Sequence, residues 1–124
     1  MSKKVFIIED EQTILNMYKT KFTGEGYEVD GAMDGEEGLK KLEEFLPDVL
    51  LLDLSLPGMN GAELLKIARS KVWGKDLKVI VMTNTGANNA PDELNGLNIS
   101  RYFVKANTTP EMVEKTVAEL INQK

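Results

Sequence analysis

The chain contains no cysteine and no histidine among its 124 residues. Without cysteine it forms no disulfide and offers no thiolate as a nucleophile or zinc ligand. Without histidine it has no Ser-His or Cys-His catalytic pair, no imidazole metal ligand and no imidazole proton relay. Its apolar runs are also far shorter than the ~20 residues that a membrane-spanning helix requires. These absences exclude several classes of enzyme, and we expect a cytoplasmic protein that does not enter the membrane.

An excess of positive charge is missing as well, because 15 basic residues stand against 20 acidic ones and the net charge is −5. We therefore expect no direct contact with nucleic acid. The charges are unevenly distributed: residues 25–48 hold nine acidic and two basic side chains, whereas residues 66–78 hold five basic and one acidic. Such runs usually form solvated faces, and the alternative interpretation is an electric field that steers a partner protein.

Short apolar runs alternate with segments of helical periodicity along the chain. Runs without polar alternation are typical of strands that are covered on both faces of a parallel sheet. The expected strands are residues 5–8, 27–29, 49–52, 79–82 and 102–104. The alternation predicts one α/β domain over residues 1–124, built on a doubly wound, five-stranded parallel sheet. Right-handed crossovers would place helices on both faces of this sheet.

Apolar residues at helical spacing predict four helices, around residues 14–22, 39–45, 64–68 and 113–121. We expect Asn60 to cap the third of these helices and Thr109 to cap the last one, with Pro110 in its first turn. The segment 84–98 is a weak helix former, with five asparagines, two glycines and one proline. At most a short helix starts there near Pro91, with Asn89 as its cap.

Polar residues follow four of the predicted strands. Glu9 and Asp10 follow the first, Asp53 the third, Thr83 the fourth and Lys105 the fifth. The carboxyl ends of parallel strands meet at one edge, so these side chains are expected to converge. Carboxylates that lie close together repel one another unless a cation neutralises them, and an all-oxygen set suits Mg²⁺. A metal, a carboxylate nucleophile and an anion clamp are the parts that phosphoryl transfer requires.

The chain resembles the receiver domain of two-component response regulators, of the single-domain chemotaxis-regulator type. The resemblance covers nearly the whole length and depends on the joint order of several features, of which the segment around Asp53 is the most specific. The features are Glu9-Asp10, the segment DVLLLDLSLPGMNG at residues 48–61, Thr83, Tyr102 and Lys105.

The resemblance implies a flavodoxin-like sheet with the strand order 2-1-3-4-5. It also implies phosphorelay signalling, in which Asp53 accepts a phosphoryl group from the phosphohistidine of a histidine kinase or a phosphotransfer protein. It implies that Mg²⁺ is held by Glu9, Asp10, Asp53 and the backbone carbonyl of Ser55. Such a domain is not an enzyme with a separate substrate, because it catalyses its own phosphoryl transfer and its own dephosphorylation.

The resemblance assigns the remaining groups to phosphoryl binding and to switching. Lys105 would pair with the attached phosphoryl group and Thr83 would bond one of its oxygens, while Tyr102 would turn inward as Thr83 moves. The side chains expected to modulate access to Asp53 are Ser55, Asn84 and Thr85. A downstream protein would bind the face of the fourth helix, fifth strand and fifth helix, and the domain would be a monomer or a weak phosphorylation-dependent dimer.

Two positions depart from the family pattern. Ala106 follows Lys105 where proline is usual, and Asn84 follows Thr83 where a small residue is usual. A cis bond before a residue other than proline costs ~3–4 kcal/mol, so we expect a trans bond between Lys105 and Ala106.

Two other functions stay open at this stage. The first is a receiver-like interaction module that works without phosphate. The departures from the family pattern at Asn84 and Ala106 keep this alternative open. The second is a phosphohydrolase of the haloacid-dehalogenase type, which also uses an Asp nucleophile, Mg²⁺ and a Lys. That nucleophile normally follows the first strand, with a second Asp two residues on, whereas Asp53 follows the third strand and is followed by Ser55.

Overall fold

The computed structural model describes residues 3–83 and 94–122. Its strands are β1 (Lys4–Ile8), β2 (Glu28–Ala32), β3 (Val49–Asp53), β4 (Lys78–Thr83) and β5 (Arg101–Val104). Its α-helices are α1 (Gln12–Gly24), α2 (Gly35–Phe45), α3 (Gly61–Arg69) and α4 (Pro110–Asn122). Short 3₁₀ turns follow α3 and β5, at η1 (Val72–Gly74) and η3 (Lys105–Asn107).

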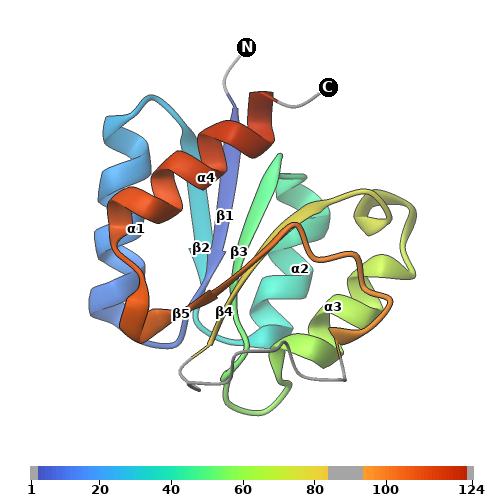
Figure 1. Cartoon of the computed structure of the whole chain (residues 1–124). Coiled ribbons are helices and arrows are strands. Elements are labelled where there is room, and N and C mark those ends of the chain that lie inside the picture. The colour runs from blue at the N-terminus through green and yellow to red at the C-terminus, as the bar shows by residue number, and fades with distance from the viewer. Residues whose placement is uncertain (1–2, 84–93, 123–124) are drawn as a thin grey trace.

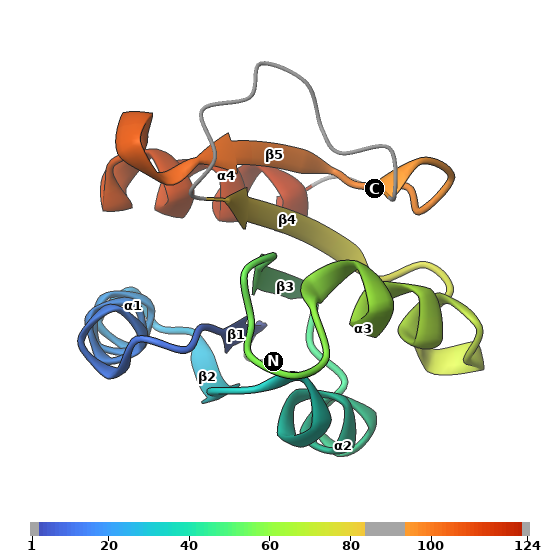
Figure 2. The ribbon, with the colours of Figure 1, turned by 90° about the horizontal axis from the view of Figure 1, so that it is seen from below.

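The five strands form one parallel sheet in the order β2-β1-β3-β4-β5. Helices α1 and α4 cover one face of this sheet, and α2 and α3 cover the other (Figures 1 and 2). The predicted flavodoxin-like topology is therefore confirmed. Within the described ranges, no helix has the length and apolar character needed to cross a membrane.

The second strand is longer than its sequence predicts and begins one residue later. Asp30 and Gly31 are poor strand formers, but Gly31 pairs with Ile7 in the register of β1 and β2. A Cβ atom at position 31 would lie 2.6 Å from the carbonyl oxygen of Ile7, so glycine is the residue that fits there. Pairing with β1 therefore determines this strand, and local propensity does not.

The helix caps follow short polar side chains. The carboxylate of Asp34 accepts a hydrogen bond from the backbone N–H of Glu37 at 2.8 Å, which starts α2 four residues before the predicted segment. The predicted caps are confirmed, because Asn60 Oδ1 and Thr109 Oγ1 each accept from the N–H three residues on, at 2.9 Å and 3.2 Å.

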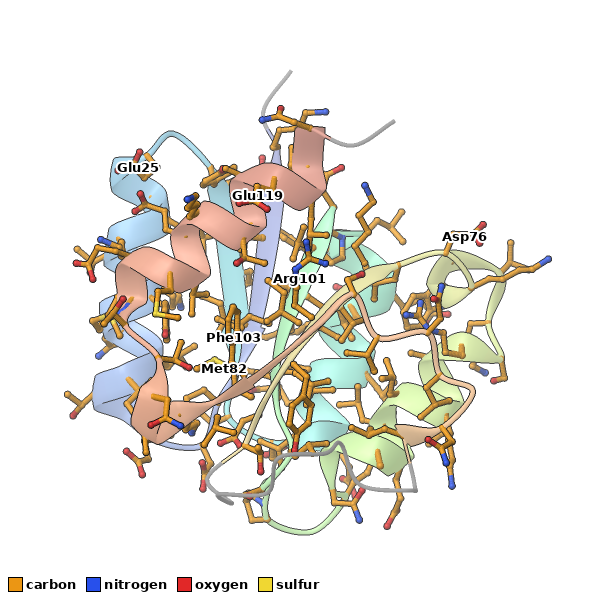
Figure 3. The ribbon with its side chains drawn as sticks, in the orientation of Figure 1. Glu25, Asp76, Met82, Arg101, Phe103 and Glu119 are labelled. Atoms are coloured by element: carbon orange, nitrogen blue, oxygen red, sulfur yellow. The ribbon has the colours of Figure 1, made fainter. Side chains whose placement is uncertain are left out.

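The core consists of two apolar layers, one on each side of the sheet. Phe6 and Leu50 pack beneath α2 and α3, whereas Ile7 and Leu51 pack beneath α1 and α4. Neighbouring residues of a strand therefore serve opposite layers, as the pleat of a sheet requires. Met82 and Phe103 are labelled in Figure 3; they are register partners in β4 and β5, and both belong to the α1–α4 layer.

The predicted short helix near Pro91, with its cap at Asn89, lies outside the described residues. The described part of that connection begins with a turn in which the N–H of Leu97 donates to the carbonyl of Leu94 at 3.1 Å. Both leucines are buried in the α2–α3 layer, so this end of the connection is anchored in the core.

Arg69, the last residue of α3, holds two loops together through their backbone carbonyls. Its Nε donates to the carbonyl of Leu97 at 2.9 Å and its Nη2 to that of Asn98 at 3.0 Å. Its Nη1 donates to the carbonyls of Gly74 at 2.9 Å and Leu77 at 2.6 Å. Burial lowers the pKa of Arg69 below its ordinary value. The guanidinium thus ties the loop before β4 to the loop before β5.

Replacing Arg69 is expected to destabilise the fold. Arg69→Met removes the donors from several part-buried carbonyls, so we expect the free energy of unfolding to fall by about 2–4 kcal/mol. Urea denaturation followed by circular dichroism measures this change. The matched control is Lys66→Met, one turn earlier on the exposed side of α3, which should change stability by less than about 0.5 kcal/mol. Equal losses in the two variants would contradict the role of Arg69.

Candidate functional site

The register of the sheet brings three carboxylates together at its carboxyl edge. Ile8 pairs with Leu52, so Glu9, which follows β1, lies level with Asp53 at the end of β3. One oxygen from each of Glu9, Asp10 and Asp53 lies within 4.8 Å of the others. Glu9 and Asp53 are each only 3% exposed, whereas Asp10 is exposed to solvent. The predicted convergence of these three residues is therefore present in the structure.

The Lys105 ammonium joins this cluster from the end of β5. Its Nζ donates to Glu9 Oε1 at 2.8 Å and to Asp53 Oδ2 at 3.0 Å. Within the described residues, no ion pair to Asp10 occurs. The cluster therefore combines three acidic groups with one cation, and Asp10 is the acidic group that the cation does not contact.

Backbone N–H groups hold the other oxygen of each buried carboxylate. Asp53 Oδ1 accepts from the N–H of Ser55 at 3.0 Å, and Glu9 Oε2 accepts from the N–H of Glu11 at 3.1 Å. Each carboxylate thus uses one oxygen for the backbone and one for Lys105. This arrangement fixes the orientation of both side chains before any ligand arrives.

Burial and charge displace the pKa values in the cluster. Burial raises the pKa of the Glu9 carboxyl to about 7, against the opposing effect of its hydrogen bonds from Lys105 and the Glu11 N–H. Burial alone would lower the pKa of Lys105, but the two carboxylates outweigh it and the pKa lies above its ordinary value. Lys105 therefore carries its positive charge at neutral pH.

Thr83 and Tyr102 belong to β4 and β5, the two strands that follow β3 in the order of the sheet. Thr83 is buried at the end of β4 and pairs with Val104, next to Lys105. Tyr102 pairs with Val81 and packs against the α2–α3 layer. Its hydroxyl oxygen is buried and has no hydrogen-bond partner in the part of the chain that the structure describes. The ring of Tyr102 is therefore turned inward here.

The loop after Lys105 lacks the usual proline and closes in another way. No peptide bond within residues 3–83 and 94–122 is cis, which confirms the predicted trans bond to Ala106. Thr108 Oγ1 donates to the carbonyl of Val104 at 2.6 Å, and the Thr108 N–H donates to that of Lys105 at 3.2 Å. These bonds close the 3₁₀ turn η3 behind Lys105. Asn84 and Thr85, the two other positions expected near Asp53, lie outside the described residues.

The family model of the response regulator receiver domain matches residues 5–117. The chain belongs to this family. It is thus a receiver domain of two-component response regulators, a family whose members take part in phosphorelays. Receiver domains bind Mg²⁺ at an acidic pocket and interact with histidine kinases or phosphotransfer proteins.

Two curated relatives are each 34% identical to the chain over most of its length. The phosphate regulon transcriptional regulatory protein PhoB of Rhizobium meliloti is 34% identical over 122 residues, which cover 97% of this chain and 53% of that protein. The sporulation initiation phosphotransferase F of Bacillus subtilis is 34% identical over 105 residues, covering 85% of this chain and 83% of that protein. The chain thus spans about half the length of the first relative and most of the second.

Solved structures share the same fold. The chemotaxis protein CheY4 of Vibrio cholerae superposes with a TM-score of 0.87 at 28% identity, covering 97% of this chain and 99% of that one. A CheY-like receiver domain protein from Methanospirillum hungatei gives a TM-score of 0.88 at 28% identity, covering 98% and 95%.

An apolar pocket that was not predicted from the sequence lies beside Lys105. The pocket has a volume of about 170 Å³, and its lining residues are Ile14, Met17, Tyr18, Met82, Lys105, Thr108 and Pro110. Burial raises the pKa of the Tyr18 phenol to about 12, and the nearby charge of Glu9 adds to this effect. Ile14, Met17 and Tyr18 have the i, i+3, i+4 spacing that places them on one face of α1, the face that lines the pocket. The same spacing is typical of any helix that packs on a core, so it did not distinguish the pocket.

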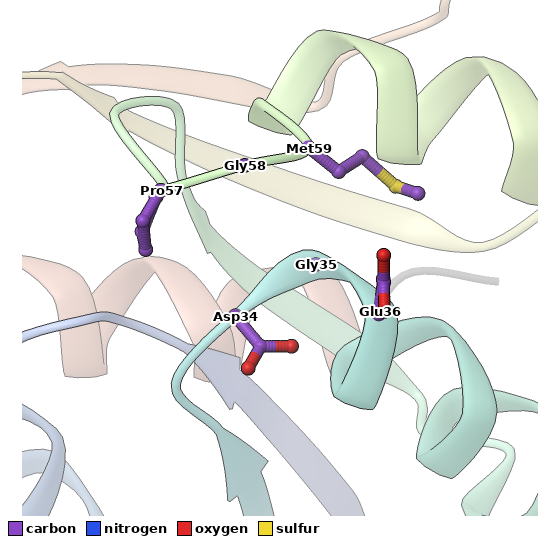
Figure 4. A pocket seen from close by; sticks show the side chains of 6 residues that line it. All are labelled: Asp34, Gly35, Glu36, Pro57, Gly58 and Met59. Atoms are coloured by element: carbon purple, nitrogen blue, oxygen red, sulfur yellow. The ribbon is translucent and has the colours of Figure 1, made fainter.

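A separate pocket of about 310 Å³ lies between the start of α2 and the loop after β3 (Figure 4). Its lining residues are Asp34, Gly35, Glu36, Pro57, Gly58 and Met59. The carboxylate of Asp34 is engaged in capping α2, and the lining contains no cationic side chain. This pocket is therefore poorly suited to an anion such as phosphate, and the acidic cluster is the candidate site.

Removing the charge of Asp10 is expected to stabilise the metal-free receiver. Asp10→Asn relieves repulsion within the cluster, so the free energy of unfolding should rise by about 0.5–1 kcal/mol in urea denaturation with a chelator present. Glu11→Gln removes the same charge from a residue outside the cluster and is the control. A lower denaturation midpoint for Asp10→Asn than for the unmodified protein would contradict the prediction.

Proposed function

We propose that this receiver accepts a phosphoryl group on Asp53 from the phosphohistidine of a histidine kinase or a phosphotransfer protein. The observation that carries the proposal is the buried Asp53 carboxylate, held at 3.0 Å by Lys105 at the carboxyl edge of the sheet. The phosphorelay role of the family supports it. An Asp53 carboxylate oxygen attacks phosphorus, a P–O bond forms, and the P–N bond of the donor breaks. The donor imidazole leaves with the electron pair and takes up a proton.

The ammonium of Lys105 offsets negative charge as the phosphoryl group arrives. It begins hydrogen-bonded to Asp53 Oδ2, so a small movement transfers that bond to a phosphoryl oxygen. Its second bond, to Glu9, keeps it at the site during this exchange. The Ser55 N–H continues to orient Asp53 from the other side. Thr83, at the end of the adjacent strand β4, supplies a hydroxyl for a further phosphoryl oxygen.

The donor set fits Mg²⁺. Three carboxylate oxygens lie within 4.8 Å of one another, and Lys105 contacts only two of the three groups, so net negative charge remains at Asp10. The residues that would hold the ion are Glu9, Asp10, Asp53 and, through its backbone carbonyl, Ser55. When bound, the ion supplies positive charge that stabilises phosphoryl transfer. Dephosphorylation is a separate step, in which water attacks phosphorus, the bond between Asp53 and phosphorus breaks, and inorganic phosphate leaves as the Asp53 carboxylate is restored. The domain therefore needs no separate substrate.

The apolar pocket beside Lys105 is the proposed docking point of the phosphoryl donor. Met17 is 37% exposed at its rim, and the pocket lies between α1 and the loop that leads into α4. A protein that covers this apolar surface brings its phosphohistidine close to Asp53. The downstream target would use the face that includes β5 and α4, where Tyr102 connects the strand to the core.

Covalent labelling of Asp53 tests the proposal directly. Incubation with a small acyl phosphate and Mg²⁺ should increase the intact mass by one phosphoryl group, and Asp53→Asn should abolish the increase. Asp48→Asn is the matched control, because Asp48 is an exposed carboxylate just before the same strand. Equal labelling of the Asp53→Asn variant would show that the acceptor lies elsewhere.

Binding of Mg²⁺ should depend on Asp10 and not on Glu11. Asp10 contributes an oxygen to the cluster, whereas only the backbone N–H of Glu11 reaches it. We expect Mg²⁺ to raise the thermal denaturation midpoint of the unmodified protein and of Glu11→Gln, because binding to the folded state stabilises it. Asp10→Asn should lose this increase. An increase that persists without Asp10 would place the metal at other residues.

A further inference from the structure

The outer surface of α2 and α3 carries a groove that the proposed phosphoryl chemistry does not use. The groove has a volume of about 210 Å³, and its lining residues are Leu39, Lys40, Glu43, Ile67, Lys71 and Trp73. Val72 lies in the chain between two of these residues and is 97% exposed, and Ile67 is also exposed. Large apolar side chains exposed together beside a groove mark a surface that binds a protein.

The two sides of this groove carry charges of opposite sign. On α2, the exposed surface is predominantly acidic, with Glu36, Glu37, Glu43 and Glu44 around Lys40. On α3 and the segment after it, the exposed basic residues Lys66, Lys71 and Lys75 outnumber the exposed acidic residues Glu63 and Asp76. A uniformly acidic partner would be repelled by α2, and a uniformly basic one by α3. A complementary partner must therefore present both signs side by side.

A second copy of this chain presents that pattern. Helices α2 and α3 cover the same face of the parallel sheet, and each leads from the carboxyl end of one strand back to the start of the next. A two-fold axis laid along the groove between them places α2 of each copy over α3 of the other. Acidic and basic surfaces then meet twice, as in an isologous interface.

We propose that the α2–α3 groove pairs with the same groove of a second copy, forming a weak symmetric dimer. The apolar residues Val72 and Ile67 become covered at its centre, and the charged residues Glu43 and Lys71 pair with their counterparts across the axis. An apolar centre within a polar rim is the usual anatomy of a protein interface. The groove is formed by the second half of α2, by α3 and by the segment that precedes β4, and it is remote from the carboxyl edge. The dimer therefore leaves Asp53 and the pocket beside Lys105 accessible and does not require phosphorylation.

Sedimentation velocity on the full chain, from about 10 μM to about 1 mM, tests the proposal. The sedimentation coefficient should rise with concentration toward that of a dimer. Val72→Ser should move the transition to at least about tenfold higher concentration, because it removes an apolar contact but no charge. Val72 is nearly fully exposed, so this variant is expected to keep its fold, which a thermal denaturation curve checks. The single tryptophan, Trp73, lines the groove, and its fluorescence should change over the same concentration range.

A charge swap separates specific pairing from general repulsion. Lys71→Glu and Glu43→Lys should each weaken association, and the double variant should restore it, because acid and base exchange sides across the axis. The double variant keeps the net charge at −5, the unmodified value. Glu43→Lys alone makes the protein less negative, so general repulsion would predict stronger association for it. A monomer at all concentrations, or association unaffected by Val72→Ser and the single charge variants, overturns the proposal.

Discussion

The contact of Lys105 with Glu9 and Asp53 is the interaction on which the candidate site depends. It joins residues 96 and 52 positions apart in the chain and links the ends of three strands. Glu9 and Asp53 are almost completely buried, and two buried carboxylates without a cation would repel each other strongly. In the sheet, β4 lies between β3 and β5. The Lys105 side chain, which follows β5, therefore reaches past the end of β4 to contact both acids. A shift of β1, β3 or β5 relative to the other two strands would separate Lys105 from one or both carboxylates.

The sequence pattern was sufficient to predict the parallel sheet and the members of this cluster, because both follow from simple rules, whereas the strand order was expected from the resemblance to receiver domains. Apolar runs mark buried parallel strands, and residues such as Asp53 that directly follow them must meet at one edge. Arg69 escaped prediction because its partners are backbone carbonyls of distant loops, which have no residue signature. The start of α2 at Gly35 escaped because its cap, Asp34, lies in a run of acidic residues. The apolar pocket at Met17 escaped because its helical spacing also describes a core.

Two part-buried cations, Lys105 and Arg69, have different roles at the two ends of the strands. At the carboxyl edge, Lys105 faces ionisable oxygens that a metal or a phosphoryl group can take over, so its bonds can be exchanged. At the amino edge, Arg69 donates to backbone carbonyls, which are uncharged, so its hydrogen bonds serve the fold. A guanidinium that donates in several directions suits the second task, and a compact ammonium suits the first.

The different roles of Lys105 and Arg69 explain why the acidic cluster can remain at the carboxyl edge, although its buried charges destabilise the fold. A buried acidic cluster contributes little to stability, and well-packed apolar residues would stabilise the same volume better. Burial raises the pKa of Glu9 to about 7, which shows that its charged form is disfavoured in the metal-free protein. Added positive charge would therefore stabilise the charged form of Glu9 and, with it, the acidic cluster. The loop carbonyls fixed by Arg69 and the two apolar layers stabilise the rest of the domain, so the carboxyl edge can retain charges that a ligand neutralises better than the protein does.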